Sequence, residues 1–218
     1  MRRAGLVFLS LAVAAVGTGM SSAKPSPGSA VTISVTPRTA VYGSRITVTG
    51  QATGKSSGGA TVTLYAKLAP AYSAAKAVAS TTTSATGQYK FTTAPTENAI
   101  YFVKVHTAPQ ATSPQVKTNV KVSISLSLTG GAGHMFFIGF VSPNYSGKPV
   151  QIQRRTAHGW KKIASATLVP ASSVPTALGA TTRSKYRKRL RLKAGTYRAF
   201  FDPMDGLRIA NHSPKRKI

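Results

Sequence analysis

Short runs of alternating apolar and polar side chains constrain the fold of this chain more than any other feature. Val31, Ile33 and Val35 alternate with Thr32 and Ser34. Similar runs lie at residues 46–49, 61–66, 89–91 and 101–105, with a weaker run around Val78. Because successive side chains of a strand point to opposite faces, each run can bury one face against a second sheet. Turn-forming residues at 42–44, 54–59, 86–87 and 93–98 separate the runs. The sequence therefore predicts an all-β fold of packed antiparallel sheets.

The segment Val120–Leu128 has the most regular alternation in the chain. We expect it to be one strand, and the first strand of a second domain, so that residues 31–118 form domain 1 and residues 119–218 form domain 2. Each domain has a length at which a single core can be buried. The junction between them is short and should limit their relative motion, with a hinge near Pro114 as the alternative.

Several features recur in the same order in the two parts of the chain. Gly50 precedes Ser57-Gly58 by seven residues, as Gly139 precedes Ser146-Gly147. The later matches are Val62-Thr63-Leu64 with Val150-Gln151-Ile152, Tyr101 with Tyr197, and Ser113-Pro114 with Ser213-Pro214. Each match is short, but their shared order indicates that one domain was duplicated.

The segments YGSRITVTG, SGGATVTLYAK and TGQYKFTTAPTENAIYFVKV, followed by SGKPVQIQRRTAHGWKKIA, SKYRKRLRL and GTYRAFF, resemble bacterial immunoglobulin-like repeats of secreted and cell-surface proteins. The resemblance covers nearly all of the chain after its first 23 residues. It implies two tandem immunoglobulin-like antiparallel β-sandwich domains. It does not select among stalk, adhesive and accessory modules, since fold does not fix function. Tyr101 and Tyr197 are candidates for the tyrosine corner of such domains, with simple core packing as the alternative.

The first 23 residues have the pattern of a secretory signal peptide. Arg2 and Arg3 precede the apolar stretch Leu6–Val16, and small residues follow at 21–23. The apolar stretch is too short for a membrane span, which needs about 20 residues. Residues 24–30 are expected to be a flexible leader. The mature chain is therefore expected outside the cell or held peripherally at the cell envelope, without a membrane span and, since there is no cysteine, without disulfides.

Residues suited to catalysis are scarce. The three carboxylates, Glu97, Asp202 and Asp205, lie among proline, glycine and asparagine in segments typical of turns. The four histidines lie far apart in sequence and have no neighbouring metal-ligand pattern. We therefore expect no enzyme activity, no cofactor and no metal site.

The charge of the chain is strongly positive, with 29 Lys and Arg residues against three Asp and Glu. Residues 119–218 contain 18 of the basic residues and two of the acidic ones. Within them, a strand over 184–193 would carry Lys185, Arg187, Arg189, Arg191 and Lys193 on one face, with Lys188 as an exception on the other. A second cluster, Arg154, Arg155, Lys161 and Lys162, surrounds Trp160, and Lys215–Lys217 is a basic tail.

A row of like charges repels itself, and an anionic ligand would relieve the repulsion. The leading expectation is a non-catalytic surface or adhesion module that binds an anionic envelope polymer or matrix glycan through these residues. Non-specific extracellular nucleic-acid binding is an alternative. Another is a neutral-carbohydrate or protein-binding module, with Trp160 and Tyr145 as a stacking platform. The last alternative is a purely structural module whose charge only confers solubility. The sequence does not predict the oligomeric state.

Overall fold

The computed structural model describes residues 30–131, 133–191 and 193–218, and the regular structure in these ranges is all β-strand. The predicted signal peptide, and the predicted leader except Ala30, lie outside the described residues. Ala30 is already in the first strand. No helix with the length and apolar character of a membrane span occurs in the ranges that are described.

The N-terminal half, residues 30–121, contains two sheets. Its strands are β1 (Ala30–Val31), β2 (Ser34–Thr36), β3 (Thr39–Val41), β4 (Ile46–Thr53), β5 (Thr61–Leu68), β6 (Ala75–Thr82), β7 (Gln88–Thr93), β8 (Ala99–Val105), β9 (Ala111–Thr112) and β10 (Val116–Lys121). One sheet joins β1, β2 and β7 to β4, and the other has the order β3-β10-β8-β5-β6 with β9 beside β8. Val48 of the first sheet and Val62 of the second are both fully buried in one shared core, as the alternating runs predict.

The C-terminal half begins at residue 122 and again contains two sheets. Its strands are β11 (Ser123–Ile124), β12 (Ser127–Gly131), β13 (His134–Ser142), β14 (Pro149–Thr156), β15 (Gly159–Thr167), β16 (Val169–Thr176), β17 (Gly179–Arg191), β18 (Thr196–Phe201), β19 (Asn211–His212) and β20 (Arg216–Lys217). One sheet has the order β11-β13-β17-β16 with β12 beside β13, and the other has the order β15-β14-β18-β19 with β20 beside β18. Phe137 and Tyr197 meet edge to face between the two sheets.

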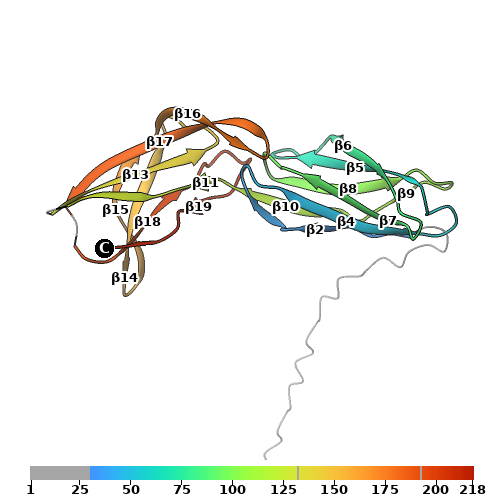
Figure 1. Cartoon of the computed structure of the whole chain (residues 1–218), viewed down its shortest axis with the longest axis horizontal. Coiled ribbons are helices and arrows are strands. Elements are labelled where there is room, and N and C mark those ends of the chain that lie inside the picture. The colour runs from blue at the N-terminus through green and yellow to red at the C-terminus, as the bar shows by residue number, and fades with distance from the viewer. Residues whose placement is uncertain (1–29, 132, 192) are drawn as a thin grey trace, which may run out of the picture.

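The two halves lie end to end (Figure 1). The loop between β18 and β19, in the C-terminal half, contacts the N-terminal half. The backbone N–H of Asn98 donates to the Leu207 carbonyl at 2.7 Å. The Arg208 Nε donates to the Thr96 carbonyl at 2.7 Å, and its guanidinium lies 5.3 Å from the Tyr42 ring. The junction thus includes direct hydrogen bonds and an arginine that reaches from one half to the other.

A glycine–tyrosine pair is repeated in the two halves. Gly50 lies opposite Tyr89 across β4 and β7, and Gly139 lies opposite Tyr186 across β13 and β17. Each tyrosine hydroxyl donates to a backbone carbonyl beyond the glycine, that of Thr32 in the first half and that of Ser125 in the second. A Cβ atom at either glycine would lie 2.1 Å from that carbonyl oxygen. The backbone approach therefore excludes every other residue at both positions.

A serine–proline pair is repeated in the same way. The Val103 N–H donates to Ser113 Oγ at 3.0 Å, and the Ala199 N–H donates to Ser213 Oγ at 3.0 Å. Both serine hydroxyls in turn donate to the carbonyl of the proline that follows. These shared details support the duplication that the sequence indicates.

Three predictions about the chain between the two halves are wrong in detail. Val120–Leu128 is not one strand, because β10 ends at Lys121 and the chain then forms β11 and β12 in another sheet. Val120 pairs with Ala40 of β3, so β10 also crosses the predicted boundary at residue 118. Pro114 does not lie at the junction either, since β9 and β10 on its two sides both pair with β8.

The two candidate tyrosine corners differ. The Tyr197 hydroxyl donates to the carbonyl of Lys193, four residues earlier, which is the geometry of a tyrosine corner. Tyr101, at the equivalent place in β8, is 3% exposed within the core cluster, and burial raises its pKa to about 12. Tyr197 therefore fixes the chain at the start of β18, while Tyr101 serves packing.

Candidate anion-binding surface

Strand β17 displays most of the predicted row of cations on its outer face. Ser184 and Tyr186 are buried, and Lys185, Arg187, Arg189 and Arg191, which alternate with them, are exposed. We call these four residues the basic ladder. The fifth residue of the predicted row, Lys193, is exposed but follows the end of the strand. Lys188, the predicted exception, pairs with the buried Phe137 and so lies on the other side of the sheet, where its side chain is also exposed.

Apolar residues of β13 lie directly beside the basic ladder. Phe136, Ile138 and Phe140 pair with Arg189, Arg187 and Lys185 in that order, and all three are partly exposed. Residues paired across two strands share a face. The outer face of this sheet is therefore a row of apolar side chains next to a row of cations.

Two guanidinium groups stack on those aromatic rings. The Arg187 guanidinium lies 4.1 Å from the centroid of Phe136, and that of Arg183 lies 3.8 Å from the centroid of Phe140. Arg183 also donates through Nε to the Ser172 carbonyl at 3.0 Å. Stacking on a ring restricts a guanidinium while its N–H groups stay free to bind oxygen atoms. Phe136, Phe140 and Arg183 were not predicted as site residues, although the run HMFFIGF places two of them on one face of a strand.

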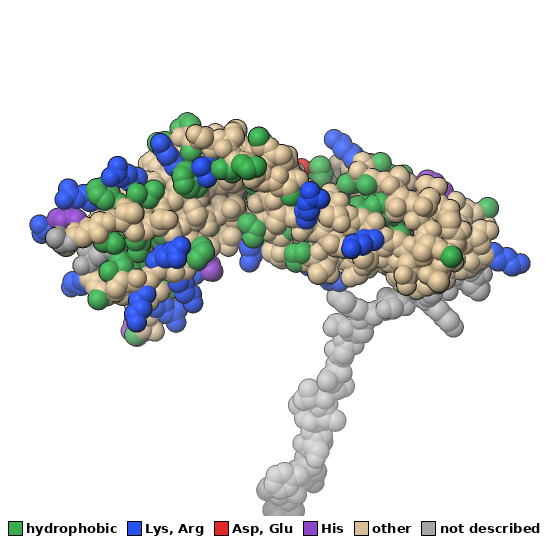
Figure 2. Space-filling model, in the orientation of Figure 1, with side chains coloured by type: hydrophobic (Ala, Val, Ile, Leu, Met, Phe, Trp, Pro, Cys, Tyr) green, Lys and Arg blue, Asp and Glu red, His purple; other side chains and the backbone are tan. Residues whose placement is uncertain are grey.

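The basic ladder has no carboxylate beside it. Among the described residues the only ion pair joins Arg208 and Asp205, at 3.2 Å. Asp202 and Asp205 lie in the loop after β18, and Glu97 follows Thr96, which accepts a hydrogen bond from Arg208. All three acids of the chain thus lie near the junction. Figure 2 shows Lys and Arg gathered around the far end of the C-terminal half.

A second group of cations surrounds Trp160 on the other sheet. The guanidiniums of Arg198 and Arg155 lie 4.3 and 5.8 Å from the Trp160 ring. Arg155 pairs with Trp160, while Lys162 and Arg198 both pair with Gln153, on the same outer face. We call Arg155, Trp160, Lys162 and Arg198 the tryptophan cluster. Arg198 was not predicted. Burial, and then the charge of Arg155, lower the pKa of Arg198.

The other two predicted members of this group point elsewhere. Arg154 pairs with the core residue Tyr197 and with Lys161, so both basic residues belong to the inner side. The Arg154 Nη2 donates to the Ala194 carbonyl at 2.8 Å. Arg154 therefore holds the turn before β18, and the predicted group of four is divided between two sides of the sheet.

Trp160 and Tyr145 do not form the predicted stacking platform. Tyr145 lies before the first residue of β14, whereas Trp160 pairs with Arg155 near the last. The Tyr145 ring packs on Phe201 at 5.0 Å, and its hydroxyl donates to Asp205 at 2.6 Å. Tyr145 therefore belongs to the junction.

The aspartates behave as the turn residues that the sequence predicts. Asp202 accepts a hydrogen bond from the Met204 N–H, and Asp205 accepts from the N–H groups of Leu207 and Arg208. The carboxylate of Asp205 also accepts hydrogen bonds from the Tyr145 hydroxyl and the Arg208 guanidinium. No cluster of three metal-ligating side chains is found over the described ranges.

A polar groove of about 790 Å³ lies on the N-terminal half. Its lining comprises Thr32, Thr49, Gly50, Gln51, Thr81–Ser84 and Gln88–Lys90. The aromatic residue in this lining, Tyr89, is 4% exposed. The groove thus presents hydroxyl and amide groups, without an exposed ring on which a sugar could stack.

No protein-family model matches this chain, and no curated protein matches its sequence. The function is therefore inferred from the side chains of this chain and their geometry.

Proposed function

We propose that this chain is a secreted, non-catalytic pair of immunoglobulin-like domains that binds an anionic polymer of the cell envelope or matrix through the basic ladder. The strand order supports the domain assignment. In the N-terminal half β4 lies between the first strands and β7, and β5, β8 and β10 are neighbours in the opposing sheet. These neighbours correspond to strands A, B and E in one sheet and strands C, F and G in the other sheet of an immunoglobulin-like sandwich. Tyr197, which has the geometry of a tyrosine corner, lies in β18, the strand that corresponds to F.

The observation that carries the binding proposal is the row of exposed cations without carboxylate partners. The cations of the ladder follow one another every second residue, which is a spacing of roughly 7 Å along a strand. A linear polymer with phosphate or carboxylate groups can contact several of them at once through charge-assisted hydrogen bonds. Such contacts are individually weak and are screened by salt, so affinity comes from their number.

The aromatic row supports this function over a purely solubilising charge. A charge that serves solubility needs no fixed geometry, whereas the Arg187 guanidinium lies over the Phe136 ring, 4.1 Å from its centroid. A guanidinium already positioned loses less conformational entropy when it binds an oxyanion.

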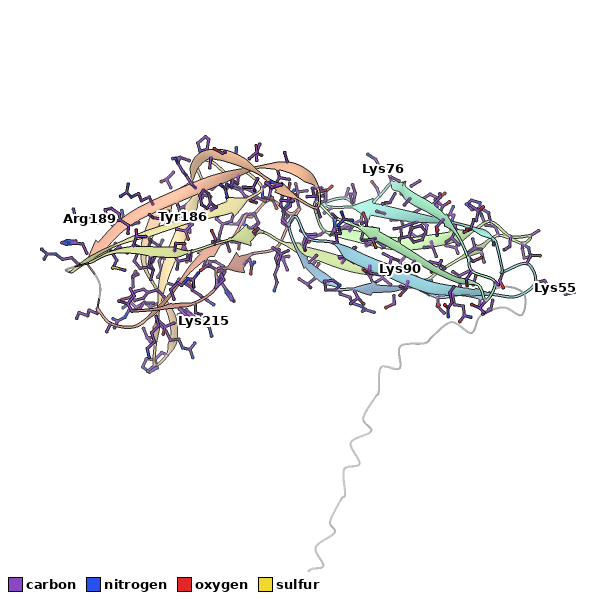
Figure 3. The ribbon with its side chains drawn as sticks, viewed as in Figure 1. Lys55, Lys76, Lys90, Tyr186, Arg189 and Lys215 are labelled. Atoms are coloured by element: carbon purple, nitrogen blue, oxygen red, sulfur yellow. The ribbon has the colours of Figure 1, made fainter. Side chains whose placement is uncertain are left out.

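The test compares two variants that lose the same number of charges. In the ladder variant, Arg187, Arg189 and Arg191 are each changed to Gln; in the control variant, Lys55, Lys76 and Lys90 are changed to Gln. All six residues are exposed, and the lysines lie on the N-terminal half (Figure 3). Binding of fluorescent inorganic polyphosphate of fixed length is measured as a function of salt.

We expect the ladder variant to bind at least about tenfold more weakly, with the slope of log affinity against log salt reduced by roughly two to three, since each lost contact lowers that slope by about one. The control variant should bind within about twofold of the unmodified protein, since its charges lie beyond a Debye length of about 8 Å from the ladder. Equal losses in both variants would show that net charge alone drives binding.

Extracellular nucleic acid is a second candidate for the same surface. Phe136 and Phe140 favour it, because partly exposed rings can stack on bases. Single-stranded DNA that binds more tightly than polyphosphate at equal phosphate concentration, and loses this advantage when Phe136 and Phe140 are changed to Leu, would select nucleic acid over an envelope polymer.

A further inference from the structure

The two sheets of the C-terminal half present cations in opposite directions. Phe137 of β13 and Tyr197 of β18 face each other across the core, with ring centroids 5.5 Å apart. Because side chains alternate along a strand, Phe136, next to Phe137, points away from the core on one side. Arg198, next to Tyr197, points away on the other side. The stacked pair of Arg187 and Phe136 and the stacked pair of Arg198 and Trp160 are thus back to back.

The tryptophan cluster has the features of a separate binding site. Arg198 Nε donates to Gln153 Oε1 at 2.8 Å, and the Gln153 Nε2 donates to Gln151 Oε1 at 3.2 Å. These bonds fix the guanidinium of Arg198 over Trp160. The guanidinium of Arg155 approaches the same ring and no carboxylate among the described residues pairs with either cation. The proximity of two like charges is unfavourable and is relieved by an anion bound between them.

We propose that the C-terminal half binds two separate chains of the anionic polymer, one on the basic ladder and one on the tryptophan cluster, and so bridges them. This inference rests on the proposed function. Packed sheets are about 10 Å apart, and the side chains on their outer faces add to that separation. One polymer chain would have to turn around an edge of the two sheets, at β15 and β16 or at β12 and β20, to reach both sites, whereas two chains bind without bending. A monomer of the protein could then cross-link a polymer network.

The first experiment measures stoichiometry with an oligophosphate long enough to cover only one face. Isothermal titration of the unmodified protein should give two oligomers per chain. The ladder variant should give one, and so should a cluster variant in which Arg155 and Arg198 are changed to Gln. A further variant, with Arg155→Gln and Lys162→Gln, keeps the hydrogen bond between Arg198 and Gln153. If this variant also loses the second oligomer, the loss is not caused by breaking that hydrogen bond. The control variant at Lys55, Lys76 and Lys90 should keep two.

The second experiment measures bridging directly. Long polyphosphate chains with donor and acceptor dyes are mixed with the protein, and energy transfer between chains is recorded while sedimentation shows whether the protein is monomeric. The unmodified protein should give transfer as a monomer, and the ladder and cluster variants should bind but give at least about fivefold less transfer, because each keeps a single site. One oligomer per unmodified chain, or transfer that persists in either variant, would overturn the bridging proposal while leaving the proposed function intact. Failure of the unmodified protein to bind polyphosphate would instead overturn the proposed function.

Discussion

At the scale of single residues, the repeated glycine–tyrosine pair fixes the packing of both halves. We predict that Gly139→Ala lowers the free energy of unfolding by about 3 kcal/mol or more, because the new methyl group would overlap the Ser125 carbonyl and the Tyr186 hydroxyl. Urea denaturation measures the loss. Gly131→Ala is the control, because a Cβ there meets no atom within 4 Å. Similar midpoints for the two variants would contradict the account of Gly139.

The ring of Phe136 orders the cation that lies on it. We predict that Phe136→Leu weakens polyphosphate binding about two- to fivefold, the loss expected from a cation–π contact of about 0.5–1 kcal/mol. The change keeps an apolar side chain and the charge of the surface, so the thermal unfolding midpoint should move little. Fluorescence anisotropy measures the affinity. An unchanged affinity would mean that the position of Arg187 does not depend on the ring.

The sequence predicts residues of the candidate binding surface only where the pattern along a single strand is sufficient. The alternation along β17 was enough to place Lys185, Arg187, Arg189 and Arg191 on one face. The role of Phe136 depends on pairing with a strand about fifty residues away, and alternation does not reveal the register of that pairing. Arg198 was missed for the same reason, since Trp160 comes from a different hairpin.

At the scale of elements, the chain from β10 to β12 shows where alternation misleads. The period of two continues from Val120 to Leu128, but the backbone leaves one sheet after Lys121 and enters another. The apolar positions remain buried on both sides of that change, so the pattern does not mark it. Ser125 separates β11 from β12, because its hydroxyl accepts the N–H of Phe140 at 3.0 Å. A side-chain oxygen thus replaces the backbone carbonyl that would accept this bond in a regular pair of strands.

The loop between β18 and β19 is held by the carboxylate of Asp205. Burial by itself raises the pKa of Asp205, but hydrogen bonds from Tyr145 and from the N–H groups of Arg208 and Leu207, together with the Arg208 charge, lower it overall. A lowered pKa means that Asp205 stabilises the fold above the ordinary aspartate pKa of about 3.9. This stabilisation is lost as the pH falls through the lower pKa of the folded state.

We therefore predict that Asp205→Asn destabilises the protein at pH 7 by about 1–3 kcal/mol, the cost of weakening hydrogen bonds to a charged group. The difference from the unmodified protein should shrink as the pH falls below about 4, where Asp205 itself becomes protonated. Asp202→Asn, which affects one exposed hydrogen bond, should have a smaller effect. Urea unfolding across this pH range measures both, and a difference that is independent of pH would contradict the role of the charge.

At the scale of the whole molecule, charge is separated along the long axis. The acids lie near the junction, and Lys and Arg gather around the far end of the C-terminal half (Figure 2). The count of basic residues in each part of the chain predicted which half carries more of the charge. It could not predict that the acids gather at the junction, because that depends on the contact of the loop between β18 and β19 with residues about 110 positions earlier.

We propose above that the basic ladder retains the protein on an anionic polymer. The most direct test is sedimentation of the protein with isolated cell-wall material, before and after removal of its anionic polymers, over increasing salt. The unmodified protein and the variant at Lys55, Lys76 and Lys90 should sediment with intact material, and both should be released by salt or by removal of the polymers. The ladder variant should stay in the supernatant at salt concentrations that retain the other two. Sedimentation that is indifferent to salt and to polymer removal, or equal for all three proteins, would contradict the account.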